Sequence, residues 1–510
     1  MNKKLFAISI MLVLAASAQA TSKVLGTQIF QTKAHQIGGS GAKMGSGSDI
    51  FLPYQKTVYG TSSSATAVTI SSAGAYLLSS DISSHSNATN VVAITGSDIT
   101  LDLGGKSISG NGTSTGIGIN VSSGLSNITI KNGVVRNLNN SGIKIGAGCS
   151  HIRIENIAVI DCDSDGILIN GTSAGSGTEV NDVVINNVIV TKCNGGEDNT
   201  TSVKGLSLNF CTQANVFNSS FDENIGSIDE PTPAYGVFMT SCTGCHFENC
   251  EAIGNSALAA HGFYIEHSYA NTFQNCSSYQ NTGTSGIGSG FYTSAAFATM
   301  FNNCEAIGTM ATTTAYGFYL NNSEDSEIVD CKISRIVGYD DPSTLDALGI
   351  YAVNGANNLI KDCSIIGCVG VGASNKAVGV MLSSETRSRI EGTEVNACTS
   401  VLGRGYGIYL ASISTIGTSI AKNIICGNSG NEASYGIYDD ASDSVTFFLQ
   451  NVCYGQESNN YSITYSDGSF DENVKNDAVI NNFGNLITAK TSPHHNISVL
   501  NQPADRKSVV

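Results

Sequence analysis

The sequence predicts an all-β fold in which short strands stack as a parallel β-helix. Each repeat unit opens with Gly, which is followed by an apolar residue, an aromatic or apolar residue, and a third residue. An apolar residue lies eleven positions after the Gly, and a Cys lies fourteen positions after it. Five clean copies open at Gly236, Gly262, Gly290, Gly317 and Gly349. The copies differ in length only before the next Gly. Insertions confined to one corner are typical of a solenoid whose coils bury their apolar faces by stacking.

The same frame continues beyond these copies. Further opening glycines occur at positions 116, 142, 166, 205, 379, 407 and 436, and we expect an earlier coil to begin near Asn90. Strongly apolar residues alternate within the triplets, and the runs are short and rich in Val, Ile, Phe and Tyr, which favours strands over helices. The pattern predicts about 12 to 13 coils, each with about three short strands. We expect the longest excursions, at 171–179, 225–235 and 337–348, to lie on the outside.

These repeats resemble the right-handed parallel β-helix proteins of the pectin-lyase-like superfamily. The resemblance rests on the Gly-Ile-x-Ile phrases at Gly116, Gly142 and Gly166, on DITLDLGGKSISGNG from Asp98 and on NNLIKDCSIIGC from Asn357. It covers roughly residues 90 to 455 and implies a right-handed solenoid with terminal caps. It implies no single activity, because the superfamily includes lyases, hydrolases, epimerases and adhesins.

Four segments are expected along the chain. Lys3 and Lys4, an apolar run and Ala18-Gln19-Ala20 predict a secretory signal peptide over residues 1–20. Residues 21–60 are predicted to be a flexible Gly/Ser-rich lead-in, 61–455 the β-helix, and 456–510 a C-terminal cap and mobile tail. No later run approaches the roughly 20 apolar residues of a membrane span. We therefore expect a secreted monomer, either extracellular, periplasmic or at the cell surface.

The charge balance excludes some partners. The chain has 25 Lys and Arg against 41 Asp and Glu, a formal net charge of −16. Nucleic acid and anionic lipid are therefore unfavourable partners. Only 13% of the residues are charged, so Ser, Thr, Asn and Gly must cover much of the surface, which suits contact with sugar hydroxyls.

The 15 cysteines follow the repeat. One column contains Cys250, Cys276, Cys304, Cys331 and Cys363, and a second column, nineteen residues after the Gly, contains Asn224, Asn255, Asn281, Thr309, Ile336, Cys368, Cys398 and Cys426. Exchange of Cys with Asn and Thr indicates interior corners that need a small side chain, so we expect a ladder of buried thiols. Disulfides within the ladder remain geometrically possible. If the chain forms a disulfide, the favoured pairs lie outside the ladder and are Cys242 with Cys245, or Cys242 with Cys211.

One motif suggests a metal. Asp161, Asp163 and Asp165 alternate before Gly166 and match the first half of a calcium loop, because Ca²⁺ prefers several carboxylate oxygens. Thr172 stands where a Glu would close the site. The alternative is a turn whose carboxylates accept bonds from backbone N–H groups. Ca²⁺ is the one cofactor that the sequence suggests.

An aromatic stripe is the main candidate for ligand binding. If the residues one and three positions after the Gly point inward, the residue between them points outward. That position holds Phe238, Tyr264, Tyr292, Tyr319, Tyr351, Met381, Tyr409 and Tyr438, but Gly118, Lys144, Leu168 and Ser207 in earlier coils. Exposed rings suit a polysaccharide or a cell-surface component. The alternative is that they stabilise the sheet by stacking.

No catalytic residue is assigned. Lys144 and Arg153 lie near the Asp161 motif in sequence and could complete a lyase-like site, and His261, Glu266 and His267 form another titratable group. Two functions follow as hypotheses. The first is a noncatalytic secreted rod that binds polysaccharide or a surface, and the alternative is a calcium-dependent polysaccharide lyase.

Overall fold

A computed structural model describes thirteen segments of the chain. They are residues 55–58, 66–83, 89–110, 116–195, 202–226, 232–339, 346–372, 376–411, 416–440, 445–454, 459–463, 479–480 and 486–488. The predicted signal peptide and nearly all of the predicted lead-in lie outside these residues. Every element in the described segments is a strand, and none of these residues forms an apolar helix long enough to span a bilayer.

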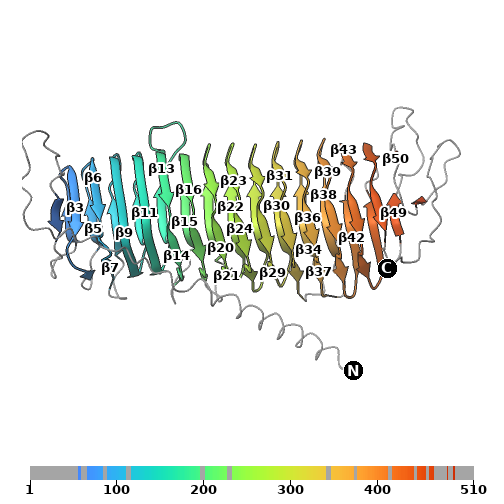
Figure 1. Ribbon diagram of the computed structural model, residues 1–510, viewed down its shortest axis with the longest axis horizontal. Coiled ribbons are helices and arrows are strands. Elements are labelled where there is room, and N and C mark those ends of the chain that lie inside the picture. The colour runs from blue at the N-terminus through green and yellow to red at the C-terminus, as the bar shows by residue number, and fades with distance from the viewer. Residues whose placement is uncertain are drawn as a thin grey trace, which may run out of the picture. The chain divides into compact units, whose positions relative to one another are not determined.

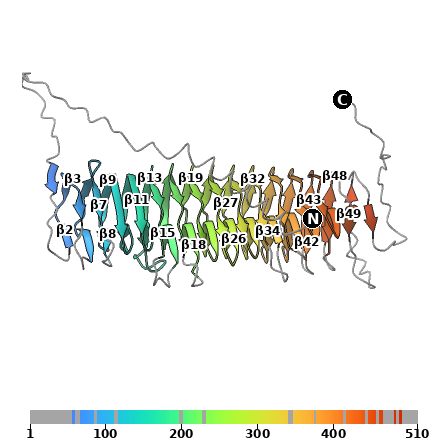
Figure 2. The same cartoon turned by 90° about the horizontal axis from the view of Figure 1, so that it is seen from below.

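The strands stack in parallel and in chain order along a solenoid, as Figures 1 and 2 show. One sheet, the front sheet, has 16 strands. They are β2 (Thr66–Ile70), β5 (Asn90–Ile94), β8 (Ile117–Val121), β10 (Ile143–Ile145), β12 (Ile167–Asn170), β15 (Val203–Asn209), β18 (Ala234–Thr240), β22 (Ala260–Glu266), β26 (Gly288–Ser294), β30 (Ala315–Asn321), β34 (Asp346–Val353), β38 (Lys376–Ser383), β42 (Arg404–Ala411), β46 (Ala433–Asp439), β49 (Asn459–Ile463) and β51 (Leu486–Thr488). The strands from β5 to β46 match the predicted number of coils.

A second sheet, the back sheet, has 28 strands. They are β1 (Gln55–Val58), β3 (Gly74–Leu78), β4 (Ile82–Ser83), β6 (Ile99–Asp102), β7 (Ser107–Ser109), β9 (Ser126–Leu138), β11 (Ser150–Cys162), β13 (Val180–Asn186), β14 (Ile189–Thr191), β16 (Cys211–Phe217), β17 (Ser220–Asp222), β19 (His246–Glu248), β20 (Glu251–Ile253), β23 (Thr272–Gln274), β24 (Ser277–Tyr279), β27 (Met300–Asn302), β28 (Glu305–Ile307), β31 (Glu327–Val329), β32 (Lys332–Ser334), β35 (Leu359–Lys361), β36 (Ser364–Ile366), β39 (Arg389–Glu391), β40 (Glu394–Asn396), β43 (Ile416–Ala421), β44 (Ile424–Cys426), β47 (Val445–Leu449), β48 (Val452–Tyr454) and β50 (Val479–Ile480).

A third, short sheet has seven two-residue strands. They are β21 (Ser256–Ala257), β25 (Thr282–Gly283), β29 (Met310–Ala311), β33 (Val337–Gly338), β37 (Val369–Gly370), β41 (Thr399–Ser400) and β45 (Ser429–Gly430). A central coil therefore runs through four strands, for example β18, β19, β20 and β21, and not through the three that we expected. The extra break comes from a left-handed residue at the bend of the back sheet, such as Asn249 with φ 53° or Asn275 with φ 51°. Asn tolerates this conformation because its short side chain can bond locally.

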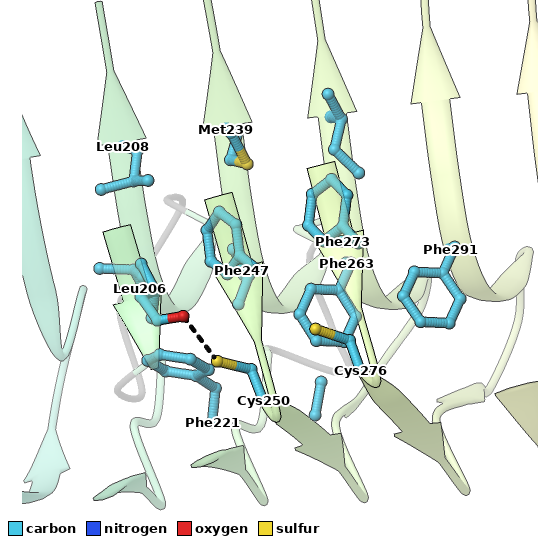
Figure 3. Close-up of a cluster of buried hydrophobic side chains, with 14 of the residues drawn as sticks. Leu206, Leu208, Phe221, Met239, Phe247, Cys250, Phe263, Phe273, Cys276 and Phe291 are labelled. Carbon is cyan, nitrogen blue, oxygen red and sulfur yellow. Dashed lines mark hydrogen bonds between the residues drawn. The ribbon is translucent and has the colours of Figure 1, made fainter. Parts of the chain in front are cut away.

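The interior consists of side-chain columns that continue from coil to coil (Figure 3). Phe247 and Phe273 of the back sheet stack with ring centroids 4.9 Å apart, and Phe263 and Phe291 of the front sheet are also 4.9 Å apart. All four rings are buried. Burial of a Phe side chain stabilises a fold by roughly 1.5–3 kcal/mol, so these repeated columns hold the coils together.

The opening glycines are required by close packing. A Cβ atom on Gly317 would lie 2.5 Å from the carbonyl oxygen of Gly349 and 2.6 Å from Ile333 Cγ2. The predicted frame is wrong in one coil. Ile119 pairs with Ile143, so Gly118 and not Gly116 is the equivalent of Gly142, and Asn120 takes the outward position that we assigned to Gly118.

Except for Cys426, the cysteines of the two predicted columns lie at corners between strands, where backbone N–H groups of one coil can donate to side chains of the next. The Cys304 N–H donates to Cys331 Sγ at 3.4 Å, and in the same column the Thr393 N–H donates to Asn423 Oδ1 at 2.9 Å. Cys, Thr and Asn can therefore replace one another here, because each is small and can accept a hydrogen bond. The second predicted column needs a correction at its end. Asn428, whose Oδ1 accepts from the Cys398 N–H at 3.0 Å, stacks there, whereas Cys426 pairs with Asn396 in the back sheet.

All 15 cysteines lie in the described segments, are buried and have no disulfide partner. Neither of the two disulfides that we named as alternatives is formed. The thiols of Cys211, Cys242 and Cys245 instead interact with one another. Burial raises the pKa of the Cys250 and Cys304 thiols, which keeps these groups neutral and unreactive.

The variable corners and the C-terminal strands complete the description. Residues 172–177, within the excursion expected at 171–179, are exposed, as predicted. The cores of the other two expected excursions, 227–231 and 340–345, lie outside the described residues. After position 455, β49 and β50 pair in parallel with β46 and β47, and β51 pairs with β49. The boundary of a C-terminal cap stays a prediction.

Candidate functional site

The outer face of the front sheet carries two columns of rings where the sequence indicated one. Alternation of buried and partly exposed residues along strands such as β18 and β22 confirms that the predicted stripe faces away from the interior. A second column lies three residues earlier in each strand. Together they form the aromatic layer, which comprises Tyr235, Phe238, His261, Tyr264, Tyr292, Tyr316, Tyr319, Tyr351, Tyr406, Tyr409, Tyr435 and Tyr438. Ser289, Leu348, Val378 and Met381 occupy the remaining positions in these columns.

The rings of the aromatic layer cover one another. Tyr264 and Tyr292 stack at 4.7 Å with an interplanar angle of 18°, and Tyr319 lies 5.2 Å from Tyr351 with an angle of 9°. Tyr316 stacks on Tyr319 within the same strand at 4.5 Å. Tyr292 is consequently only 9% exposed. The ring stacking that we gave as the alternative is therefore present, and a second column, which the sequence does not display as part of the same surface, packs against the predicted stripe.

Hydroxyl groups of the layer make polar contacts with the following coil. The hydroxyls of Tyr264 and Tyr351 interact with the side chains of Ser294 and Ser383 in the next coil. Burial raises the pKa of both tyrosines, and these interactions oppose it. The phenols therefore stay neutral near pH 7 and can both donate and accept hydrogen bonds.

His261 is built into the layer as a neutral group. Its ring stacks on Tyr235 at 5.3 Å, and its Nδ1 lies 2.6 Å from Ser289 Oγ. Burial lowers the pKa of His261 to about 3. Of the predicted titratable group, Glu266 lies beside exposed His267, with 3.7 Å between Oε1 and Nδ1, whereas His261 contacts Tyr235 and Ser289.

A charged cluster lies at the N-terminal end of the layer. Lys204 Nζ is 3.5 Å from Asp165 Oδ1, and the two side chains are 18% and 8% exposed. Burial raises the pKa of Asp165, while the charges of Lys204 and Lys144 act in the opposite direction. Lys204 Nζ also lies 5.2 Å from the ring centroid of Phe238. Lys204 was not among the residues that the sequence indicated, although it occupies the same frame position as Tyr235.

The three aspartates of the suggested calcium loop have different surroundings. Asp161 is exposed, Asp163 is half-buried and Asp165 is paired with Lys204. Within the described segments, no group of three or more His, Cys, Asp or Glu side chains is arranged to hold a metal ion. The calcium hypothesis thus gains no support from this arrangement. Arg153 lies in β11 of the back sheet, apart from Lys144 in β10 of the front sheet.

The repeats match a known family model. The protein-family model "Right handed beta helix region" matches residues 204–372 and 310–452. A comparison with curated proteins gave no match. Among solved structures, the A-module of the Azotobacter vinelandii mannuronan C-5 epimerase AlgE6 is 13% identical, with a TM-score of 0.41, over 78% of this chain and 91% of that one.

Two further structures have the same level of similarity. A variant of the periplasmic alginate epimerase AlgG is 11% identical over 76% of this chain and 79% of its own, with a TM-score of 0.40. ORF18 of Geobacillus virus E2 is 12% identical over 67% of this chain and 55% of its own, with a TM-score of 0.36. The matched repeats and the stacked parallel sheets identify the chain as a right-handed parallel β-helix repeat protein.

Proposed function

We propose that this protein is a secreted, noncatalytic rod that binds a polysaccharide along the outer face of its front sheet. The observation that carries the proposal is the aromatic layer, which extends from β18 to β46 on the side of the sheet opposite the core. Fold stability alone does not require it, because the corresponding positions in β8, β10, β12 and β15 are Asn120, Lys144, Leu168 and Ser207.

The chemistry of the layer suits sugar hydroxyls. Ser294, Asn321 and Ser383 lie in a column beside the tyrosines, and their side chains interact with neutral phenols of the preceding coil. Each phenol combines an apolar ring edge with a group that donates and accepts hydrogen bonds. Because the ring faces are occupied by neighbouring rings, a glycan would contact edges and hydroxyls. Secretion rests on the predicted signal peptide over residues 1–20.

A polysaccharide lyase is the less favoured alternative. Such an enzyme needs a base that can take a proton from the substrate. Lys204 is engaged with Asp165, and His261 is buried against Tyr235 and Ser289, so neither side chain is poised for that role. The alternative predicts new unsaturated chain ends, which ultraviolet absorbance detects, and it predicts that added calcium increases their rate of formation.

Tyrosine-to-phenylalanine changes provide the sharpest test of the binding proposal. The triple variant Tyr264→Phe/Tyr319→Phe/Tyr351→Phe removes three hydroxyls and keeps the stacked rings. We expect retention on insoluble polysaccharides to fall at least tenfold, since each lost bond contributes about 0.5–1.5 kcal/mol. The matched control is Tyr76→Phe, a tyrosine of β3 in the back sheet whose hydroxyl donates to the Ser72 carbonyl at 2.6 Å. Unchanged retention of the triple variant would contradict the proposal.

A further inference from the structure

We infer that the glycan bound by the aromatic layer is uncharged, so that the protein selects against polysaccharides rich in carboxylates. This inference rests on the proposed function and specifies the class of ligand. It comes from the distribution of formal charge along the front sheet.

The central part of the layer has no cation to receive a carboxylate. Strands β18, β22, β26, β30 and β34 contain no Lys or Arg, and their two formal charges are the carboxyl groups of Glu266 and Asp346. His261 does not supply a positive charge, because burial lowers its pKa to about 3. An acidic sugar placed here would meet like charge without a counter-charge.

The cations at the two ends of the layer already have acidic partners. Lys204 pairs with Asp165 at 3.5 Å, and Arg404 Nε lies 3.1 Å from Glu432 Oε2. Lys376 acts on Asp346 in the preceding strand and lies 5.2 Å from the Tyr409 ring centroid. A glycan carboxylate could use one of these cations only by competing with its present partner.

Lys144 is the second cation whose charge acts on Asp165. It lies in β10, three strands before β18, which corresponds to about 14 Å at the usual strand spacing. That separation exceeds the Debye length of about 8 Å at physiological ionic strength, so the attraction between Lys144 and a carboxylate bound at the layer is screened.

Charge elsewhere in the chain acts in the same direction. By sequence, residues 196–201, 227–231 and 340–345, which connect to β15, β18 and β34, contain six Asp and Glu and no Lys or Arg. The formal net charge of the chain is −16. A net charge of this size slows the approach of a polyanion, most strongly at low salt.

Pairs of polysaccharides that share a backbone and differ in charge test the inference. Suitable probes are hydroxyethylcellulose against carboxymethylcellulose, and carboxyl-reduced alginate against alginate, with binding measured by biolayer interferometry at low and physiological salt. We expect the neutral member of each bound pair to bind at least tenfold more tightly, and the ratio to shrink as salt rises. Glu266→Gln should narrow the ratio by improving binding of the acidic member.

The outcomes separate this inference from the proposed function. Suppose that the acidic members bind equally well or more tightly, and that the Tyr264→Phe/Tyr319→Phe/Tyr351→Phe variant loses this binding. This result would overturn the inferred selection against charge, but it would still support the aromatic layer as the binding site. Binding of neither member of any pair would overturn the proposed function itself for glycans of these backbones.

Discussion

The carboxyl group of Glu385 fills the space that the absent side chain of Gly355 leaves in the preceding coil. Glu385 Oε1 accepts a hydrogen bond from the Gly355 N–H at 2.9 Å, and Oε2 accepts from Asn358 Nδ2 at 2.9 Å and from Ser388 Oγ at 2.6 Å. Burial raises the pKa of Glu385, and these three bonds oppose the rise. A buried carboxyl with all its donors in place favours one register between adjacent coils.

Substitution of Gly355 tests this fit. A Cβ atom there would lie 2.2 Å from the Ser323 carbonyl oxygen and 2.7 Å from Glu385 Oε1, so Gly355→Ala must displace backbone or break the carboxyl network. We expect the free energy of unfolding to fall by about 2–4 kcal/mol, as for overpacking combined with a lost buried hydrogen bond. Urea denaturation followed by circular dichroism measures this change.

The matched control for that variant is Gly367→Asn. Gly367 has φ 71°, the space that a Cβ atom would occupy is open to a distance of 4 Å, and Asn tolerates this backbone conformation. Its stability should change by less than about 0.5 kcal/mol. Equal losses in the two variants would show that the contacts of an added Cβ atom with Ser323 and Glu385 contribute little to the cost at position 355.

Asp222 makes stability depend on pH near neutrality. Burial raises the pKa of Asp222 to about 7, and the nearby charges of Glu251 and Glu223 add to the rise. Its carboxyl accepts bonds from Ser220 Oγ and, at 3.1 Å, from the Ile253 N–H. In the unfolded chain an Asp titrates near pH 3.9, so the folded state holds its proton more tightly. This contribution to stability is complete below about pH 4 and is lost as pH rises through about 7.

The variant Asp222→Asn mimics the protonated form at every pH. We expect it to equal the natural protein in stability at about pH 4 and to exceed it by at least about 1 kcal/mol at pH 8, because a shift of one pKa unit corresponds to 1.36 kcal/mol. Urea denaturation at both pH values measures the difference. A constant difference between the two proteins across this range would refute the role of Asp222.

The thiol column predicts a definite redox state. Cys250, Cys276, Cys304, Cys331 and Cys363 are buried, and the corner bonds of Cys250 and Cys304 hold their sulfur atoms against backbone carbonyls. We expect at least four of the five to be recovered as free thiols when the protein is alkylated in denaturant and analysed by mass spectrometry. Alkylation of the folded protein should label none of them. Recovery of two disulfides within the column would contradict the ladder of thiols.

Tyr292 separates the structural and binding roles of the aromatic layer. Because the ring is 9% exposed and packs on Tyr264 and Tyr319, Tyr292→Ser should destabilise the fold by about 2–4 kcal/mol. Substitution of an exposed residue would change the stability by less than about 0.5 kcal/mol. Tyr292→Phe should cost less than about 1 kcal/mol, since it preserves the stacked ring. Thermal unfolding of the two variants measures the contrast, and equal midpoints would show that ring packing at this position contributes little.

The sequence alone determined the repeat and the direction of its side chains. A Gly at each opening position reports a steric demand that any coil with a neighbour must meet, as Gly317 shows against Gly349. Alternation within the triplets likewise separates core residues such as Phe263 from outward ones such as Tyr264, because side chains point to opposite faces of a strand. The first demand recurs in every coil and the second follows from strand geometry, so the repeated sequence pattern is enough to predict both.

Contacts between coils were decided only by the tertiary structure. Lys204 meets Asp165 across 39 positions, and Asn428 rather than Cys426 stacks on Cys398, because corners of variable length change how many residues separate stacked neighbours. The exposure of the tyrosines was also decided by the tertiary structure, because a second column of side chains, three residues earlier in each strand, packs against them. Stacking distance and register are set by backbone hydrogen bonds between coils, so residue spacing in the chain does not by itself predict which side chains touch.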